Sequence, residues 1–208
     1  MQRFAGIIAA LGNPGRQYAT TRHNFGFMVL DRLVDSRGGW ESLPAVDAGG
    51  DCRAGALTVT PGRPKWLALE PMAYMNRSGP AVARACRRFA VDPADLVVVH
   101  DDLDIELGRM KLRKGGSDAG HNGVGSVIAE LGSEAFLRLR LGIGRPPGRQ
   151  DPADYVLSAF DPAELAVVDA VAAAAVDGLR LLSRMGRDAA TRHVNGFAVQ
   201  APSDQPES

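Results

Sequence analysis

The 208-residue sequence predicts one α/β domain built on a largely parallel or mixed sheet. Three observations lead to this fold class. Apolar runs of strand length alternate with helical patterns along the chain. Residues 4–11 are nearly all apolar, as expected of a strand that is buried on both faces. No linker divides the chain, so we expect one domain over residues 1–198 and a disordered tail over residues 199–208.

The remaining strands are predicted from short runs that are either continuously apolar or strictly alternating. The run "DLVVVHDDLD" is a buried strand whose end is loaded with carboxylates, and "FLRLRLGIG" alternates so that Arg138 and Arg140 share one face. The predicted strands after residues 4–11 are residues 55–60, 65–70, 95–104, 109–114 and 136–144.

The helices are predicted from apolar spacing and from cap residues at their starts. Thr20 or Thr21 can cap a first helix that ends at "SRGG", and Asn122 lies near the N-cap of another. The segment "RPPGRQDPADY" has no such pattern and is predicted to be a mobile loop. The other predicted helices are residues 78–89, capped by Ser78 with Pro80 in the first turn, and residues 161–186, capped by Asp161 with Glu164 closing a capping box.

Composition excludes several classes of protein. Hydrophobic content is 45% and charged content 23%, which is ordinary for a globular domain, and no apolar run approaches the roughly 20 residues of a membrane helix. Cys52 and Cys86 provide neither a disulfide framework nor a zinc ligand set, and we expect both to be reduced thiols in a cytoplasmic protein. The apolar N-terminal run ends in a turn and lacks a cleavage site, so a strand is favoured over a signal peptide.

The net charge is zero, but the charges are unevenly distributed along the chain. Residues 109–149 contain eight Lys or Arg and only three acids, and the balance reverses from Gln150 onward. This asymmetry predicts one basic and one acidic face, although a solvated surface without a ligand explains it equally well.

Polar side chains cluster where the predicted strands end. In open α/β sheets, active sites lie beyond the carboxyl ends of the strands. The stretches "GNPG", "YMN", "HDDLD" and "GHNG" occupy such places, and with a histidine at the start of the first helix they form a hydrolytic set that has no obvious covalent nucleophile. The residues that this placement can bring together are Asn13, His23, Asn76, Asp101, His121 and Asn122.

His23 is expected in the first turn of its helix, where the positive helix end keeps imidazole neutral, as a general base requires. A carboxylate on the second ring nitrogen would fix the tautomer, and Asp101, Asp102 and Asp104 can each supply it, because spacing does not choose among them. A surface histidine and strand-end turn aspartates are the alternative interpretation.

Other candidate sites are weaker. An asparagine amide can donate to an oxyanion, yet Asn13, Asn76 and Asn122 are also normal turn or cap residues. Ser117 approximates a nucleophile elbow, but the glycine-rich loop continues before a helix begins. "GNPG" lacks the spacing of a dinucleotide-binding turn, and no His or Cys spacing indicates a metal. We therefore expect neither a metal nor a cofactor.

Six ordered stretches between residues 4 and 197 resemble bacterial peptidyl-tRNA hydrolase. They are "ALGNPG", "YATTRHNFGF", "PMAYMNRSG", "VVVHDDLD", "GGSDAGHNG" and "RLRLGIGRP". The resemblance implies a three-layer domain with a mixed, largely parallel sheet flanked by helices. It also implies hydrolysis of the ester between a peptide and the 3′ end of tRNA.

The resemblance further implies a role for each candidate residue. His23 would activate water with Asp101 as its partner, and Asn13 would sense the blocked amino group of the substrate. Asp118 departs from the family pattern and adds a negative charge, which we expect to alter affinity without abolishing activity. The other implied substrate-binding or tRNA-binding residues are Tyr18, Tyr74, Met75, Asn76, Arg113, His121, Asn122 and Arg140.

Two rival functions predict different behaviour. A non-catalytic RNA-binding relative would need the basic face but not His23, and a serine esterase would depend on Ser117. The intact set of His23, Asp101 and Asn13 favours the hydrolase. We expect a cytoplasmic monomer with peptidyl-tRNA as its substrate, no obligate protein partner and no membrane contact.

Overall fold

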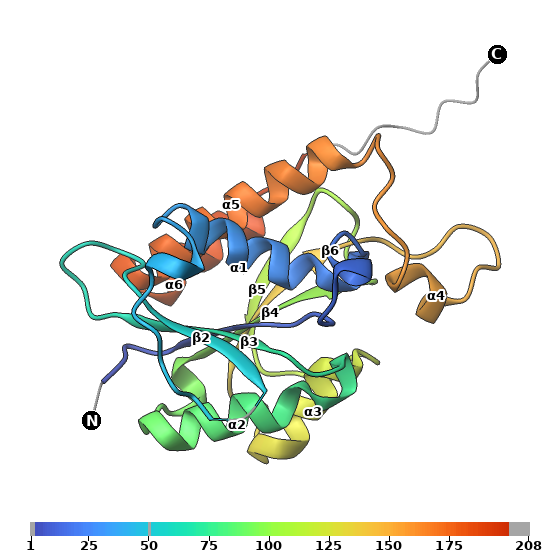
Figure 1. The fold of residues 1–208 in the computed structure, drawn as a ribbon. Coiled ribbons are helices and arrows are strands. Elements are labelled where there is room, and N and C mark those ends of the chain that lie inside the picture. The colour runs from blue at the N-terminus through green and yellow to red at the C-terminus, as the bar shows by residue number, and fades with distance from the viewer. Residues whose placement is uncertain (1–2, 50, 200–208) are drawn as a thin grey trace.

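A computed structural model describes residues 3–49 and 51–199, which form a sheet of six strands in the order β2-β3-β1-β4-β6-β5 (Figure 1). The four central strands are parallel, and the edge strands β2 and β5 run antiparallel to their neighbours. The strands are β1 Ile7–Ala10, β2 Cys52–Leu57, β3 Trp66–Pro71, β4 Leu96–Asp102, β5 Met110–Lys114 and β6 Leu137–Gly142.

Helices cover the sheet on both faces, so the predicted α/β architecture is confirmed (Figure 1). Alternate residues of β1 face opposite ways. Ile8 packs into the core under α1, α5 and α6, whereas Ile7 packs into the core under α2 and α3. The principal helices are α1 Phe25–Asp35, α2 Ser78–Phe89, α3 Asn122–Leu131, α5 Leu165–Met185 and α6 Arg187–Gly196.

The parallel register places the ends of β1, β3 and β4 at one edge of the sheet. Ala10 pairs with Val99, and Ala9 pairs with Leu69. The turn after β1, the turn after β3 and the last residues of β4 therefore lie side by side. This edge is where the sequence places its polar stretches.

Gly26 allows α1 to approach the sheet unusually closely. A Cβ atom at this position would lie 2.4 Å from the carbonyl oxygen of Val99 and 2.6 Å from that of Leu11. Both oxygens belong to backbone and have little room to move. Only glycine therefore fits, and the start of α1 lies directly against the ends of β1 and β4.

Several helix starts differ from those predicted. Thr21 precedes a 3₁₀ turn, Arg22–Asn24, and its hydroxyl donates to the Tyr18 carbonyl instead of capping α1. Ser78 is the first residue of α2, and its hydroxyl donates to the Met75 carbonyl. Glu164 accepts from the Asp161 N–H, which is one half of the expected capping box, but α5 begins only at Leu165. In each case the hydroxyl or carboxylate satisfies a preceding turn or loop.

Two helices have no counterpart in the prediction. The expected mobile loop contains α4, Pro152–Val156, which is capped by Asp151. The segment after Gly186 forms α6, and its Asn195 amide oxygen accepts from the Leu112 N–H on β5. Of the predicted tail, only Val199 lies within the described residues, and its N–H donates to the Gly108 carbonyl.

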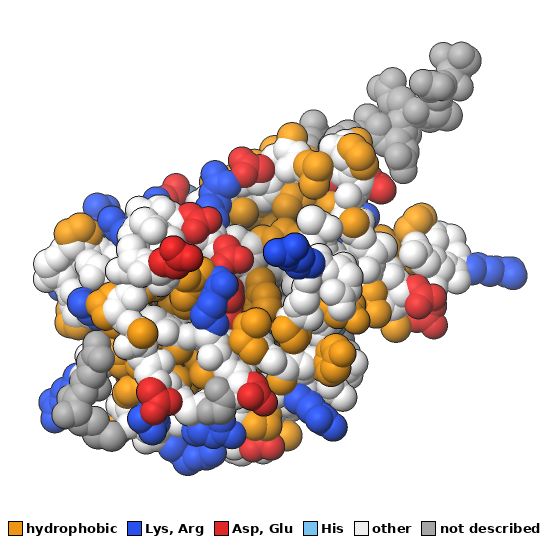
Figure 2. Space-filling model, in the orientation of Figure 1, with side chains coloured by type: hydrophobic (Ala, Val, Ile, Leu, Met, Phe, Trp, Pro, Cys, Tyr) orange, Lys and Arg blue, Asp and Glu red, His pale blue; other side chains and the backbone are white. Residues whose placement is uncertain are grey.

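The free cysteines agree with the prediction, whereas the face of the molecule that is drawn in Figure 2 shows no separation of acidic from basic side chains. Cys52 and Cys86 are free thiols, as predicted. The face shown in Figure 2 mixes acidic and basic side chains. No helix within residues 3–49 and 51–199 is both long enough and apolar enough to cross a membrane.

Candidate active site

A cavity of about 610 Å³ opens at the carboxyl edge of the sheet. Its walls come from the turns after β1 and β3, the end of β4, the loop before α3, and α4. Eight of the eleven candidate residues line it: Asn13, His23, Tyr74, Met75, Asn76, Asp101, His121 and Asn122.

The other three candidates lie outside the cavity wall. Tyr18 belongs to the 3₁₀ turn Arg16–Tyr18, and Arg113 and Arg140 lie on β5 and β6. Arg113 pairs with Arg138, and Arg140 pairs with Lys111 across the two strands. Directly opposed residues share a face of the sheet, so these four cations lie on one face.

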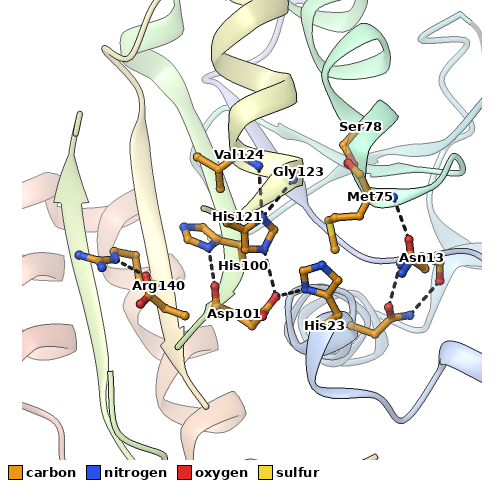
Figure 3. Close-up of polar contacts among 12 residues, drawn as sticks. Asn13, His23, Met75, Ser78, His100, Asp101, His121, Gly123, Val124 and Arg140 are labelled. Carbon is orange, nitrogen blue, oxygen red and sulfur yellow. Dashed lines mark hydrogen bonds and ion pairs between the residues drawn. The ribbon is translucent and has the colours of Figure 1, made fainter. Parts of the chain in front are cut away.

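His23 and Asp101 meet at the centre of the site (Figure 3). His23 Nδ1 lies 2.9 Å from Asp101 Oδ1, and both side chains are buried. A carboxylate only accepts hydrogen bonds, so Nδ1 carries the proton and Nε2 keeps its lone pair. The expected place in the first turn of an α-helix was wrong, because His23 lies in the 3₁₀ turn before α1.

His121 is held in the tautomer opposite to that of His23, with its proton on Nε2. Its Nδ1 accepts from the backbone N–H groups of Gly123 and Val124, at 3.1 and 3.3 Å, and so caps α3 (Figure 3). Because Nδ1 accepts, Nε2 carries the proton and donates to Asp101 Oδ1 at 3.1 Å. Asn122, predicted near this N-cap, is the first residue of α3.

Asp101 stays ionised under these two donors. Burial alone would raise its pKa, but the hydrogen bonds that His121 and His23 donate hold the pKa well below its usual range. The neighbouring carboxylates are engaged elsewhere: Asp102 with Arg140 Nε at 2.6 Å, and Asp104 with Arg145. Asp101 is therefore the carboxylate that faces His23.

A third histidine lies behind this pair. His100 is buried on β4, and its ring is 4.8 Å from that of His121. Burial lowers the pKa of His100 to about 3. His100 therefore remains neutral and supports the ring of His121 without adding a charge.

Asn13 is fixed by its neighbours (Figure 3). Its Oδ1 accepts from the Met75 N–H at 2.8 Å, so its Nδ2 is left as a hydrogen-bond donor. Its main-chain N–H donates to the Asn24 side-chain oxygen, and its carbonyl accepts from the Asn24 amide. These bonds join the turn after β1 to the turn that carries His23.

The rim of the cavity is more open than its floor. The Asn76 and Asn122 side chains are exposed, and Tyr74 is 62% exposed, whereas Met75 is buried in the wall. Exposed amides beside a buried imidazole can bind a polar group and a water molecule at the same time.

Comparison with known proteins identifies the family. The family model "Peptidyl-tRNA hydrolase" matches residues 7–202. The chain belongs to the peptidyl-tRNA hydrolase family. A peptidyl-tRNA hydrolase of Solidesulfovibrio magneticus is 48% identical, with 96% of this chain and 98% of the relative covered. One from Rhodococcus opacus is 44% identical, with 94% of this chain and all of the relative covered.

Solved structures of peptidyl-tRNA hydrolases share the fold. The structure of the Acinetobacter baumannii protein superposes with a TM-score of 0.83 at 30% identity, covering 95% of this chain and 98% of that one. A peptidyl-tRNA hydrolase in complex with N-propanol gives a TM-score of 0.83 at 29% identity, covering 95% and 99%. The single-domain, mixed-sheet architecture is thus that of the peptidyl-tRNA hydrolases.

The three-residue centre also resembles a set of metal ligands, which sequence spacing did not indicate. Ligand atoms of His23, Asp101 and His121 lie within 4.8 Å of one another. Hydrogen bonds of 2.9 and 3.1 Å among these same atoms account for their proximity. The arrangement is thus explained by proton positioning alone.

Sequence reasoning missed part of this peptidyl-tRNA hydrolase cavity. Val156 and Leu157 line one wall from α4 and the residue after it. Asp151 followed by Pro152 is an N-cap signal and could have identified this helix. Asp118, the departure from the family pattern, also lines the cavity.

Proposed function

We propose that this chain hydrolyses the ester bond between a peptide and the 3′ end of tRNA, with His23 as the general base. Membership of the peptidyl-tRNA hydrolase family makes the chain a hydrolase of peptidyl-tRNA. The observation that carries the mechanism is the 2.9 Å contact between His23 Nδ1 and Asp101, which leaves Nε2 available to a water molecule in the cavity.

The reaction needs no covalent nucleophile. A water molecule gives its proton to His23 Nε2 as its oxygen bonds to the ester carbonyl carbon. Asp101 stabilises the imidazolium that forms. The tetrahedral intermediate then expels the ribose oxygen, which takes the proton from His23, and the products are free peptide and tRNA. The exposed amides of Asn76 and Asn122 line the same cavity, and we assign them to stabilising the oxyanion and holding the water.

Asn13 is proposed to select peptidyl-tRNA over aminoacyl-tRNA. The Met75 N–H occupies its oxygen, so Asn13 offers an N–H donor to the substrate. A donor binds the carbonyl of a blocked amino group and repels the ammonium of an unblocked one. Replacing Asn13 by alanine should lower the ratio of the two rates by about tenfold, since one hydrogen bond is lost.

The remaining candidates are assigned to tRNA binding. Lys111 and Arg113 are exposed on the face of β5 that adjoins Arg140, whose guanidinium also pairs with Asp102, and we assign these cations to the phosphates at the tRNA 5′ end. Tyr18 and Tyr74 are proposed to contact the acceptor end. We also propose that the enzyme acts as a monomer, since one chain supplies the groups that line the cavity. A role in the cytoplasm is a separate proposal, which follows from the proposed tRNA substrate. Light scattering and cell fractionation test these two points.

Turnover of peptidyl-tRNA by His23→Ala tests the mechanism. We expect kcat to fall by about 10²-fold or more while tRNA affinity is retained. The matched control is His193→Ala, because residues 191–193 repeat the Thr-Arg-His string but place His193 on α6, where it contacts the Ala174 carbonyl. Wild-type turnover by His23→Ala would exclude the proposed base.

A further inference from the structure

The residue before His23 is a buried arginine whose side-chain partners lie between residues 155 and 164. Arg22 is 3% exposed. Its Nη1 donates to the Ala159 carbonyl at 2.9 Å, and its Nη2 donates to Glu164 Oε2 at 2.7 Å. The guanidinium carbon also lies 4.5 Å from the ring centroid of Tyr155 and 4.9 Å from that of Phe160.

The main chain joins the same two segments. Thr21 and Ala159 form an isolated antiparallel bridge. The Arg22 N–H donates to the Ser158 carbonyl at 3.0 Å, and the Phe160 N–H donates to the Thr20 carbonyl at 3.4 Å. We call residues 151–160 the wall segment, because α4 and Leu157 form one side of the cavity that His23 faces.

A buried guanidinium needs this combination of partners. Removing a charge from water is costly unless it is paired and hydrogen-bonded. Glu164 supplies the opposite charge, Ala159 supplies a carbonyl acceptor, and the two rings supply aromatic faces. Lysine has one compact ammonium and cannot make the planar set of contacts, so charge alone does not replace arginine here.

We propose that Arg22 is a positioning residue for the hydrolysis, which locks the wall segment to the turn that carries His23. The buried guanidinium, together with the main-chain bonds between the two segments, then holds the imidazole and the wall segment in one geometry. The inference rests on the proposed role of His23 as the base. Small displacements of a reacting group cost large factors in rate, so loosening this lock lowers kcat.

The test compares Arg22→Lys with Arg32→Gln. Arg32 pairs with Asp169 on the exposed side of α1 and is not among the residues that line the cavity, so it controls for the loss of an arginine ion pair. For Arg22→Lys we expect kcat to fall by about tenfold or more, with KM for peptidyl-tRNA within about threefold of wild type. Hydrogen exchange of the Phe160 amide should accelerate by about tenfold, while exchange in β4 stays unchanged.

A second variant keeps the inference open to refutation if Arg22→Lys does not fold. Glu164→Gln retains the size of the partner but removes its charge, and we expect smaller changes in the same direction. A kcat within twofold of wild type in either folded variant overturns the inference, and so does faster exchange that extends through β4. Turnover retained by His23→Ala would refute the role of His23 as the base. Hydrogen exchange of the Phe160 amide would still test whether Arg22 holds the wall segment.

Discussion

The change Asp101→Asn tests the chemistry of the site most directly. The carboxylate accepts from two imidazoles through one oxygen, at 2.9 and 3.1 Å. Asparagine keeps an oxygen of the same reach but has no charge to stabilise an imidazolium. Breaking a buried charge pair costs about 3–5 kcal/mol. His23 is positively charged only while its ring holds the proton taken from water. The lost charge pair therefore destabilises the transition state and lowers kcat.

The expected decrease in kcat is therefore roughly 10²- to 10⁴-fold, with a much smaller change in KM. The assay is steady-state hydrolysis of peptidyl-tRNA near neutral pH. Asp102→Asn is the matched control, since it removes the same charge one residue along β4 but from the partner of Arg140. We expect it to change KM and to leave kcat within about threefold. If Asp101→Asn keeps kcat within tenfold of wild type, a carboxylate-assisted imidazole does not carry the reaction.

Three further predictions concern stability, tRNA binding and the nucleophile. Burial, followed by repulsion from the charge of Asp31, raises the pKa of Glu70 to about 8 from 4.5. The folded protein therefore loses stability as pH rises from about 4.5 to about 8, because the buried carboxyl has to ionise, and the stability gained by Glu70→Gln should be roughly 4 kcal/mol larger at about pH 8.5 than at about pH 5, measured by thermal unfolding; equal gains would contradict this. Arg113→Gln should weaken tRNA binding and reduce its salt slope by about 1, whereas an unchanged slope would remove Arg113 from the interface. Ser117→Ala should hydrolyse peptidyl-tRNA at nearly the wild-type rate, and loss of turnover would favour a serine esterase.

The fold and the edge that carries the site were predictable because both depend on long apolar runs. The apolar runs in residues 4–11 and 95–104 favour buried strands, and the carboxyl ends of these strands bring Asn13 and Asp101 to one cavity. Spacing could not choose among the three aspartates, because the choice depends on the face to which each side chain points. The strand pleat directs Asp102 to Arg140 and Asp101 to the histidines.

The remainder depends on contacts that are distant in sequence. α6 has a weak apolar pattern and is tied to β5 through Asn195 and Leu112. The cap of α3 by His121 was missed, since histidine is not among the preferred N-cap residues. Arg22 looks like any surface arginine until Glu164, 142 positions away, is placed beside it.

The absence of a Cβ atom at Gly26 limits which substitutions this position can accept. The residue is not among those that line the cavity, yet it sets how close the helix after His23 lies to the ends of β1 and β4. A single added methyl group would lift the helix and carry the base with it. Position 26 is thus a place where catalytic alignment can be damaged while every reacting group is still present.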